Sequence, residues 1–143
     1  MFSTSKVSDA LRNAYGATAY RVLDPIRTFE LRVGQPSSAL RALYRRHHVN
    51  CAAFITAWNP YSENTDDTAN ERAQAALAHD LRSLDCNVIA GVGEDPAGEW
   101  PGEPSVLALA LTRAQTEQLG HKYRQNAVIW IAEDAIPRLI LLR

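Results

Sequence analysis

The sequence predicts a single α+β domain, with a central mixed sheet of about six or seven strands and about three helices. Its 143 residues are the length of one domain, and 46% hydrophobic residues are enough to build a core. Strand-like segments outnumber helix-like segments along the chain. A mixed-sheet α/β arrangement is the alternative. We expect residues 1–143 to form one globular domain, with residues 1–16 as an N-terminal helix or extension.

The first third of the chain predicts a short helix and two strands, followed by a second helix. The predicted first helix is Asp9–Tyr15, and a turn at residues 24–25 separates predicted strands at Thr18–Leu23 and Thr28–Val33. The second strand alternates apolar and polar residues, which is typical of a half-buried strand. After a break at residues 34–38, a helical spacing places four side chains on one stripe: Leu40, Leu43, Tyr44 and His47.

The rest of the chain alternates apolar strands with well-marked helices. Cys51–Ala57 is a short apolar run, typical of a central strand covered on both faces. Thr68–Glu71 fits a capping box, so Thr68 is the predicted first cap of a helix whose apolar stripe runs to Leu84. Thr112–Gln115 fits a second capping box. The remaining predicted elements are a helix to about residue 123 and strands at 87–92, 105–111, 127–131 and 138–142.

Charge and hydropathy narrow the function classes. The net charge is −1, no apolar run approaches the roughly 18 residues of a membrane span, and the first residues do not resemble a secretory signal. We therefore expect a soluble, cytoplasmic protein; a homo-oligomer is left open. Residues 1–50 hold eight basic and three acidic residues. They could attract nucleic acid, but we favour two halves with complementary charge because the arginines are spread over several elements.

The end of the predicted central strand is the most informative stretch. Ligands of open sheets usually bind beyond strand ends, and Thr56 and Asn59 offer donors and acceptors there. Trp58 could stack on a flat ring or cover the core. The alternative is a structural strand exit, with Asn59 in a turn ahead of Pro60.

Three amides in other segments are further candidates for the site. Asn70 falls on the buried stripe of its helix, where an unpaired amide costs about 1–3 kcal/mol. Asn59 or a ligand across the loop is the candidate partner, and local loop backbone is the alternative. Gln125 and Asn126 lie between a helix and a strand, where they could read a base edge or a sugar, or pin the turn.

The loop at residues 91–105 resembles a phosphate-binding loop but fails its fingerprint, because no lysine follows the glycines and prolines interrupt the next helix. Its carboxylates could bind a divalent cation, although a solvated acidic loop is favoured. Glu103 stands apart because it lies at a strand entrance. We predict no metal and no cofactor, since the histidines and the two cysteines lack ligand spacing. The carboxylates of the loop at residues 91–105 belong to Glu94, Asp95, Glu99 and Glu103.

Several short motifs occur together in this chain. They are Thr18-Ala19-Tyr20, FITAWNP at residues 54–60 with Asn70 and Arg72, Trp100-Pro101 with Glu103 and Ser105, and QNA at residues 125–127. In this combination the chain resembles a family of uncharacterised bacterial proteins, number 3293 among the domains of unknown function. Gly102 is a departure, because the family pattern has Glu directly after Trp-Pro. The resemblance implies one fold and one shared polar site, without an activity, cofactor or catalytic residue.

We predict that these side chains meet at one pocket mouth. The leading hypothesis is a small nucleotide-like or phosphorylated ligand. Whether the protein is an enzyme is left open; if it is, Glu103 is the candidate catalytic residue, acting as general base. The alternative is a binding, regulatory or protein-interaction module whose polar cluster is structural, and nucleic-acid binding is less expected. The predicted ligand-binding residues are Arg32, Thr56, Trp58, Asn59, Asn70, Arg72, Trp100, Gln125 and Asn126.

Overall fold

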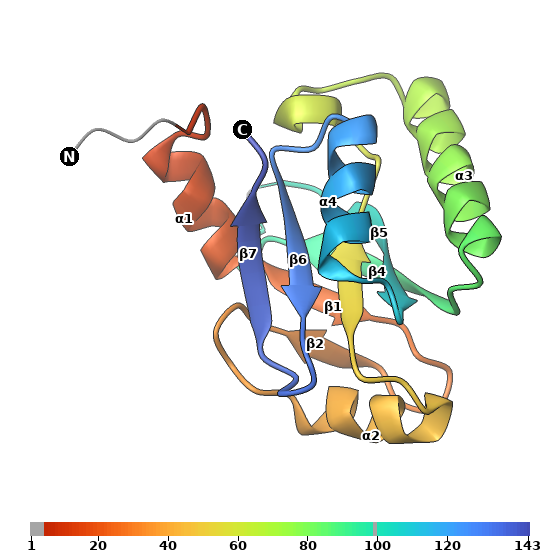
Figure 1. Cartoon of the computed structure of the whole chain (residues 1–143). Coiled ribbons are helices and arrows are strands. Elements are labelled where there is room, and N and C mark those ends of the chain that lie inside the picture. Colours follow the sequence, from red (N-terminus) through yellow and green to blue (C-terminus); the bar gives the residue numbers. More distant parts are fainter. Residues whose placement is uncertain (1–4, 99) are drawn as a thin grey trace.

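The computed structural model describes residues 5–98 and 100–143 (Figure 1). The described residues form four α-helices, a short 3-10 helix and seven strands, so the predicted α+β class is confirmed. The helices are α1 (Asp9–Ala17), α2 (Ser38–His47), η1 (Pro60–Ser62), α3 (Asp67–Ser83) and α4 (Arg113–Lys122). The strands are β1 (Ala19–Val22), β2 (Phe29–Leu31), β3 (Ala52–Ile55), β4 (Val88–Glu94), β5 (Glu103–Leu109), β6 (Ala127–Ile131) and β7 (Pro137–Leu141).

The seven strands form one sheet in the order β2-β1-β4-β5-β3-β6-β7, and every pairing in it is antiparallel. The expected mixed sheet is therefore wrong in this detail. Helix α3 does connect two parallel strands, β3 and β4, but antiparallel β5 lies between them. In the same way α4 connects β5 to β6 across β3. Each helical crossover skips one strand, as in a split βαβ unit.

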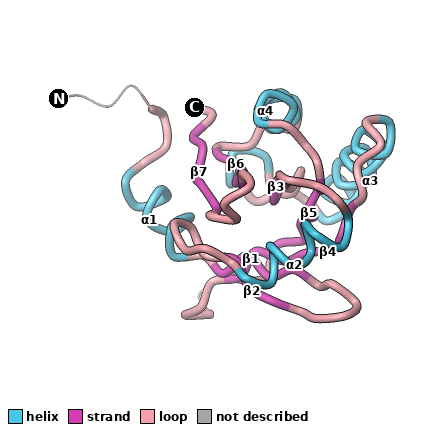
Figure 2. Tube along the Cα trace, turned by 60° about the horizontal axis from the view of Figure 1, so that its bottom comes forward, coloured by secondary structure: helices cyan, strands magenta, loops and turns pink. Residues whose placement is uncertain are grey.

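The sheet curls around one of its faces, which we call the inner face. Its side chains include Tyr20, Phe54, Leu107 and Ile129, which belong to one buried cluster. The curl brings the two edge strands, β2 and β7, close together. The amide of Gly34, after β2, donates to the carbonyl of Pro137, the first residue of β7, at 2.9 Å. Figure 2 shows β6 and β7 standing at a steep angle to β1 and β2.

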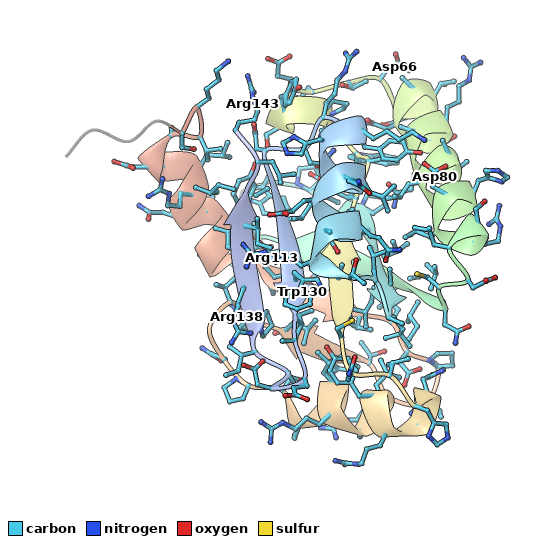
Figure 3. The ribbon with its side chains drawn as sticks, in the orientation of Figure 1. Asp66, Asp80, Arg113, Trp130, Arg138 and Arg143 are labelled. Carbon is cyan, nitrogen blue, oxygen red and sulfur yellow. The ribbon has the colours of Figure 1, made fainter. Side chains whose placement is uncertain are left out.

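Helices cover both faces of the sheet. Side chains of α2 (Leu40, Leu43 and Tyr44) close one end of the inner face, and the Tyr44 hydroxyl donates to the carbonyl of Ile131. Helices α3 and α4 cover the outer face. Asp80 of α3, labelled in Figure 3, joins these two helices because its carboxylate accepts from Lys122 and Tyr123. These hydrogen bonds lower the pKa of Asp80 below its ordinary value. Helix α1 lies at the other end of the inner face, away from α2 (Figure 1).

The start of α3 differs from the prediction. The N-cap is Asp66, whose side chain accepts from the Ala69 amide at 2.9 Å, and Thr68 lies inside the first turn. The prediction that Thr68 caps this helix is therefore wrong, because a competing carboxylate lies two residues earlier. The second capping box, with Thr112 and Gln115, is confirmed at the start of α4.

Candidate functional site

A cavity of about 350 Å³ lies at the end of the inner face away from α2. Helix α1 forms one wall, through Leu11, Ala14 and Tyr15. Strands β1, β3, β5, β6 and β7 supply other walls, and Figure 1 shows α1 beside β7. The volume is at the small end of the roughly 300–1,000 Å³ that ligand pockets span.

The cavity exists because the inner-face side chains become small at this end of the sheet. On β5 the inner-face position changes from Leu107 to Ser105, and on β6 from Ile129 to Ala127. On β4 the corresponding position is Gly93, which pairs with Glu103. These small residues were not among the predicted site residues. The sequence pattern that could have indicated them is a set of strands in which the inward-facing, alternate positions change from large to small side chains near one end.

Most of the cavity wall is apolar. Tyr20 and Phe54 meet edge to face with ring centroids 5.2 Å apart. Rings in this arrangement add about 0.5–1.5 kcal/mol beyond their buried area. The loop side chain of Trp100 also lines the cavity and remains 36% exposed. The other large apolar residues on the wall are Leu11, Ile55, Val128, Ile129 and Leu139.

Glu103 is the acidic residue that lines the cavity. Glu103 is the first residue of β5 and pairs with Gly93 of β4. Tyr20 of β1 pairs with the same glycine, so the side chains of Glu103 and Tyr20 both lie on the inner face. Within residues 5–98 and 100–143, no hydrogen bond or ion pair reaches its carboxylate. Burial raises its pKa from 4.5 to about 7. The inserted Gly102 has thus not turned Glu103 away from the cavity.

Six hydroxyl groups line the cavity: those of Tyr15 and Ser62 bond each other at 2.6 Å, and each of the other four donates its hydrogen to a backbone carbonyl. The distances are 2.6 Å from Thr18 to Ala14, 2.7 Å from Tyr20 to Tyr15, 2.7 Å from Thr56 to Pro104 and 3.1 Å from Ser105 to Glu103. A hydroxyl has one hydrogen to donate. In this state the four groups therefore offer lone pairs, and no hydrogen, to the cavity.

Asn59 and Asn70 form a satisfied pair at the end of β3. Asn59 has a left-handed backbone (φ 45°, ψ 70°), and its Oδ1 accepts from the Thr65 amide and from Asn70 Nδ2. Asn70 is 1% exposed, and its Oδ1 accepts from the Asn59 amide at 2.9 Å. Asn70 thus finds its partner in Asn59 and does not line the cavity. Asn59 does, and its Nδ2 has no partner among the described residues.

Gln125 and Asn126 are neighbours with different surroundings. Gln125 lines the cavity; its Nε2 donates to the carbonyls of Trp58 and Tyr123, while its Oε1 has no partner in the described chain. Asn126 lies outside the lining and bonds Ser62 and Arg143. Figure 3 labels Arg143 near the C-terminus, where its guanidinium lies 3.9 Å from the centre of the Tyr61 ring. Asn126 therefore connects the loop after β3 to the C-terminal residue and does not face the cavity.

Both predicted arginines lie outside the cavity lining. Arg32 follows Leu31, an inner-face residue, so its side chain turns the other way and bonds Ala17 and Glu30. Arg72 lies two residues after buried Asn70 and is therefore exposed on α3. Trp58 is half-buried and also outside the lining. The residues that the structure brings together from the predicted set are Thr56, Asn59, Trp100, Glu103 and Gln125.

The acidic loop does not gather around one point. Glu94 pairs with Arg21 at 3.5 Å on the outer face, whereas Glu103 faces the cavity. Glu99 lies outside the described residues. In the part of the chain that the structure describes, no group of three or more His, Cys, Asp or Glu side chains is placed to hold a metal ion.

The fold and the cavity define a class: an α+β protein whose curled antiparallel sheet holds a largely apolar cavity with one unpaired carboxyl group. The chain belongs to the family described as "Protein of unknown function (DUF3293)", whose model matches residues 55–128, just over half of the chain. No curated protein and no solved structure matches it. The matched segment includes Thr56, Glu103 and Gln125, and α1 and β1 lie outside it. None of the described helices is long and apolar enough to span a membrane.

Proposed function

We propose that this protein binds a small organic molecule in the cavity between α1 and the inner face of the sheet. The observation that carries the proposal is the carboxyl group of Glu103, which faces the cavity without a partner among the described residues. Glu103 is half-buried, and acidic groups withdrawn from water are normally paired. An acid left unpaired in a preformed, largely apolar pocket therefore favours a ligand that completes the pairing.

The charge of the wall favours an uncharged or cationic ligand over a phosphorylated one. None of the described lining residues is Lys, Arg or His, and the two arginines expected to bind a phosphate lie elsewhere. Phosphate binding normally uses such cations or a helix N-terminus. A nucleoside-like ring remains compatible with the cavity, since its edge donates hydrogen bonds without bringing phosphate charge.

The proposal is tested by filling the cavity. A Cβ atom on Gly93 would meet only the Thr18 methyl group, at 3.8 Å, so Gly93→Val fits the strand and narrows the cavity. We expect small fragments that raise the melting temperature of the wild type to lose that effect in this variant. Val92→Thr, on the opposite face of β4, is the control and should keep it. If no fragment shifts the wild type, or the shifts persist in Gly93→Val, the cavity is not a binding site and the polar cluster is structural.

A further inference from the structure

We propose that the ligand carries a protonated nitrogen on a compact apolar body, and that Glu103 and the acceptor atoms around it bind this nitrogen. This inference rests on the proposed function, because it names the chemistry of the molecule that fills the same cavity. Three independent features of the wall support it: its charge, the direction of its hydrogen bonds and its apolar surface.

The charge around Glu103 lacks a cation. The other titratable side chains on the wall are Tyr15 and Tyr20, and neither is basic. Arg21, adjacent to Tyr20 on β1, points to the outer face and pairs with Glu94. The chain therefore offers Glu103 no counter-ion among the described residues. A cationic ligand supplies one, and removal from water strengthens such a pair.

Most of the lining hydroxyl groups can only accept hydrogen bonds from a ligand. Four of the six lining hydroxyls donate their hydrogens to backbone carbonyls, so toward the cavity these four can only accept. Gln125 commits its Nε2 to two carbonyls and leaves its Oε1 as a further acceptor. The unpartnered donors on the described wall belong to Asn59, Asn64 and Trp100, together with one hydrogen of the Tyr15–Ser62 hydroxyl pair.

The part of the wall formed by Glu103, these four hydroxyls and the Gln125 Oε1 atom selects against ligands that need donors. A carboxylate or phosphate has only acceptors and would face the oxygens of Glu103 and the hydroxyls without a hydrogen bond. An ammonium group has three donors and no acceptor, so it matches this wall. Phe54, Ile129 and Leu139 line the same cavity and suit a short apolar body attached to the nitrogen.

Three probes that share a phenyl ring and a short linker separate these possibilities: 2-phenylethylamine, 2-phenylethanol and phenylacetate. Their affinities for the full chain would be measured by titration calorimetry at pH 8. There, a pKa of about 7 leaves Glu103 mostly ionised, and an alkylamine is protonated. We expect the amine to bind at least about tenfold more tightly than the alcohol, and phenylacetate to bind more weakly than either.

Two variants assign the preference to one carboxyl group. Glu103→Gln should reduce the advantage of the amine to less than about threefold, while Glu94→Gln removes the same charge from the outer face and should leave it unchanged. If the alcohol or the acid binds as well as the amine, or the preference survives in Glu103→Gln, the inference is wrong although the cavity still binds ligands. If none of the three probes binds, the proposed function fails as well. The comparison on the wild type decides the charge preference even if a variant does not fold.

Discussion

Glu103 links the site to the stability of the whole chain. Burial raises its pKa from 4.5 to about 7, so the folded chain holds the proton more tightly than the unfolded chain. The stabilisation that results is complete below about pH 4.5 and is lost as the pH rises through about 7. Above that pH, the folded chain must keep a charge in a largely apolar cavity.

Replacing this acid with an amide should remove that loss. We expect Glu103→Gln to be more stable than the wild type at pH 8, by up to about 3 kcal/mol, and the advantage to shrink toward pH 5. Urea unfolding at both pH values measures it. Glu94→Gln, at an exposed ion pair with Arg21, should differ from the wild type by less than about 1 kcal/mol at either pH. An equal effect of Glu103→Gln at pH 5 and pH 8 would contradict this account.

Asn70 is the polar side chain on which the loop after β3 depends. It is 1% exposed and bonds Asn59 through both its Oδ1 and its Nδ2, and its Nδ2 also reaches the Thr65 carbonyl. Asn70→Ala leaves those loop groups without partners, and we expect a loss of about 1–3 kcal/mol in the free energy of unfolding. Arg72→Ala, two residues away on the exposed side of α3, should change it by less than about 0.5 kcal/mol. Chemical denaturation of both variants checks the contrast, and similar losses would refute it.

At the scale of elements, the two candidate N-cap residues of α3 can be compared directly. Asp66 accepts from the Ala69 amide at the start of α3, whereas Thr68 is exposed inside the first turn. We expect Asp66→Ala to cost about 1 kcal/mol and Thr68→Ala to be nearly neutral. Thermal unfolding of the two variants decides which residue caps the helix. A larger loss from Thr68→Ala would restore the capping box at residues 68–71.

The elements themselves were predictable because their signals are local. The capping box at Thr112 and the apolar run that became β3 lie within one stretch of sequence each, and both were placed within two residues of their ends. The order of the strands was not predictable in this way. Strand β5 inserts between β3 and β4, and that pairing depends on long-range contacts that no local pattern encodes.

The residues of the candidate site likewise divide into those that a local sequence pattern predicted and those that it did not. Asn59, Asn70 and Glu103 were selected because polar groups at strand ends or on apolar stripes need partners, and the structure places them within one connected region. Arg32 and Arg72 were grouped with them to supply positive charge to the ligand, but Arg32 turns away from the inner face, Arg72 is exposed on α3, and both lie outside the cavity. Gly93 and Ala127 were missed, because their contribution to the cavity is the absence of a large side chain.

At the scale of the whole molecule, α1 is the α-helix that contributes least to the buried core. None of its residues is buried, whereas all four residues of β3 are. Its links to the body of the fold include a 2.6 Å hydrogen bond between the hydroxyls of Tyr15 and Ser62, and the Tyr20 hydroxyl bound to the Tyr15 carbonyl. The Nε atom of Arg12 is buried in this helix without a hydrogen-bond partner among the described residues. Since α1 also forms a wall of the cavity, local opening of this helix is the route that we propose for entry of the ligand.

Hydrogen exchange measures this difference in stability. We expect amides of α1 to exchange at least about 100-fold faster than those of β3, because elements with little buried surface open locally without unfolding the sheet. Tyr15→Phe removes the hydroxyl bond to Ser62 and should speed exchange in α1 further while leaving β3 unchanged. Any fragment that binds in the cavity should slow exchange in α1, because the helix must then open against the contacts of Leu11 and Tyr15 with the ligand. Equal protection of α1 and β3 would mean that the helix belongs to the cooperative core and that ligands enter elsewhere.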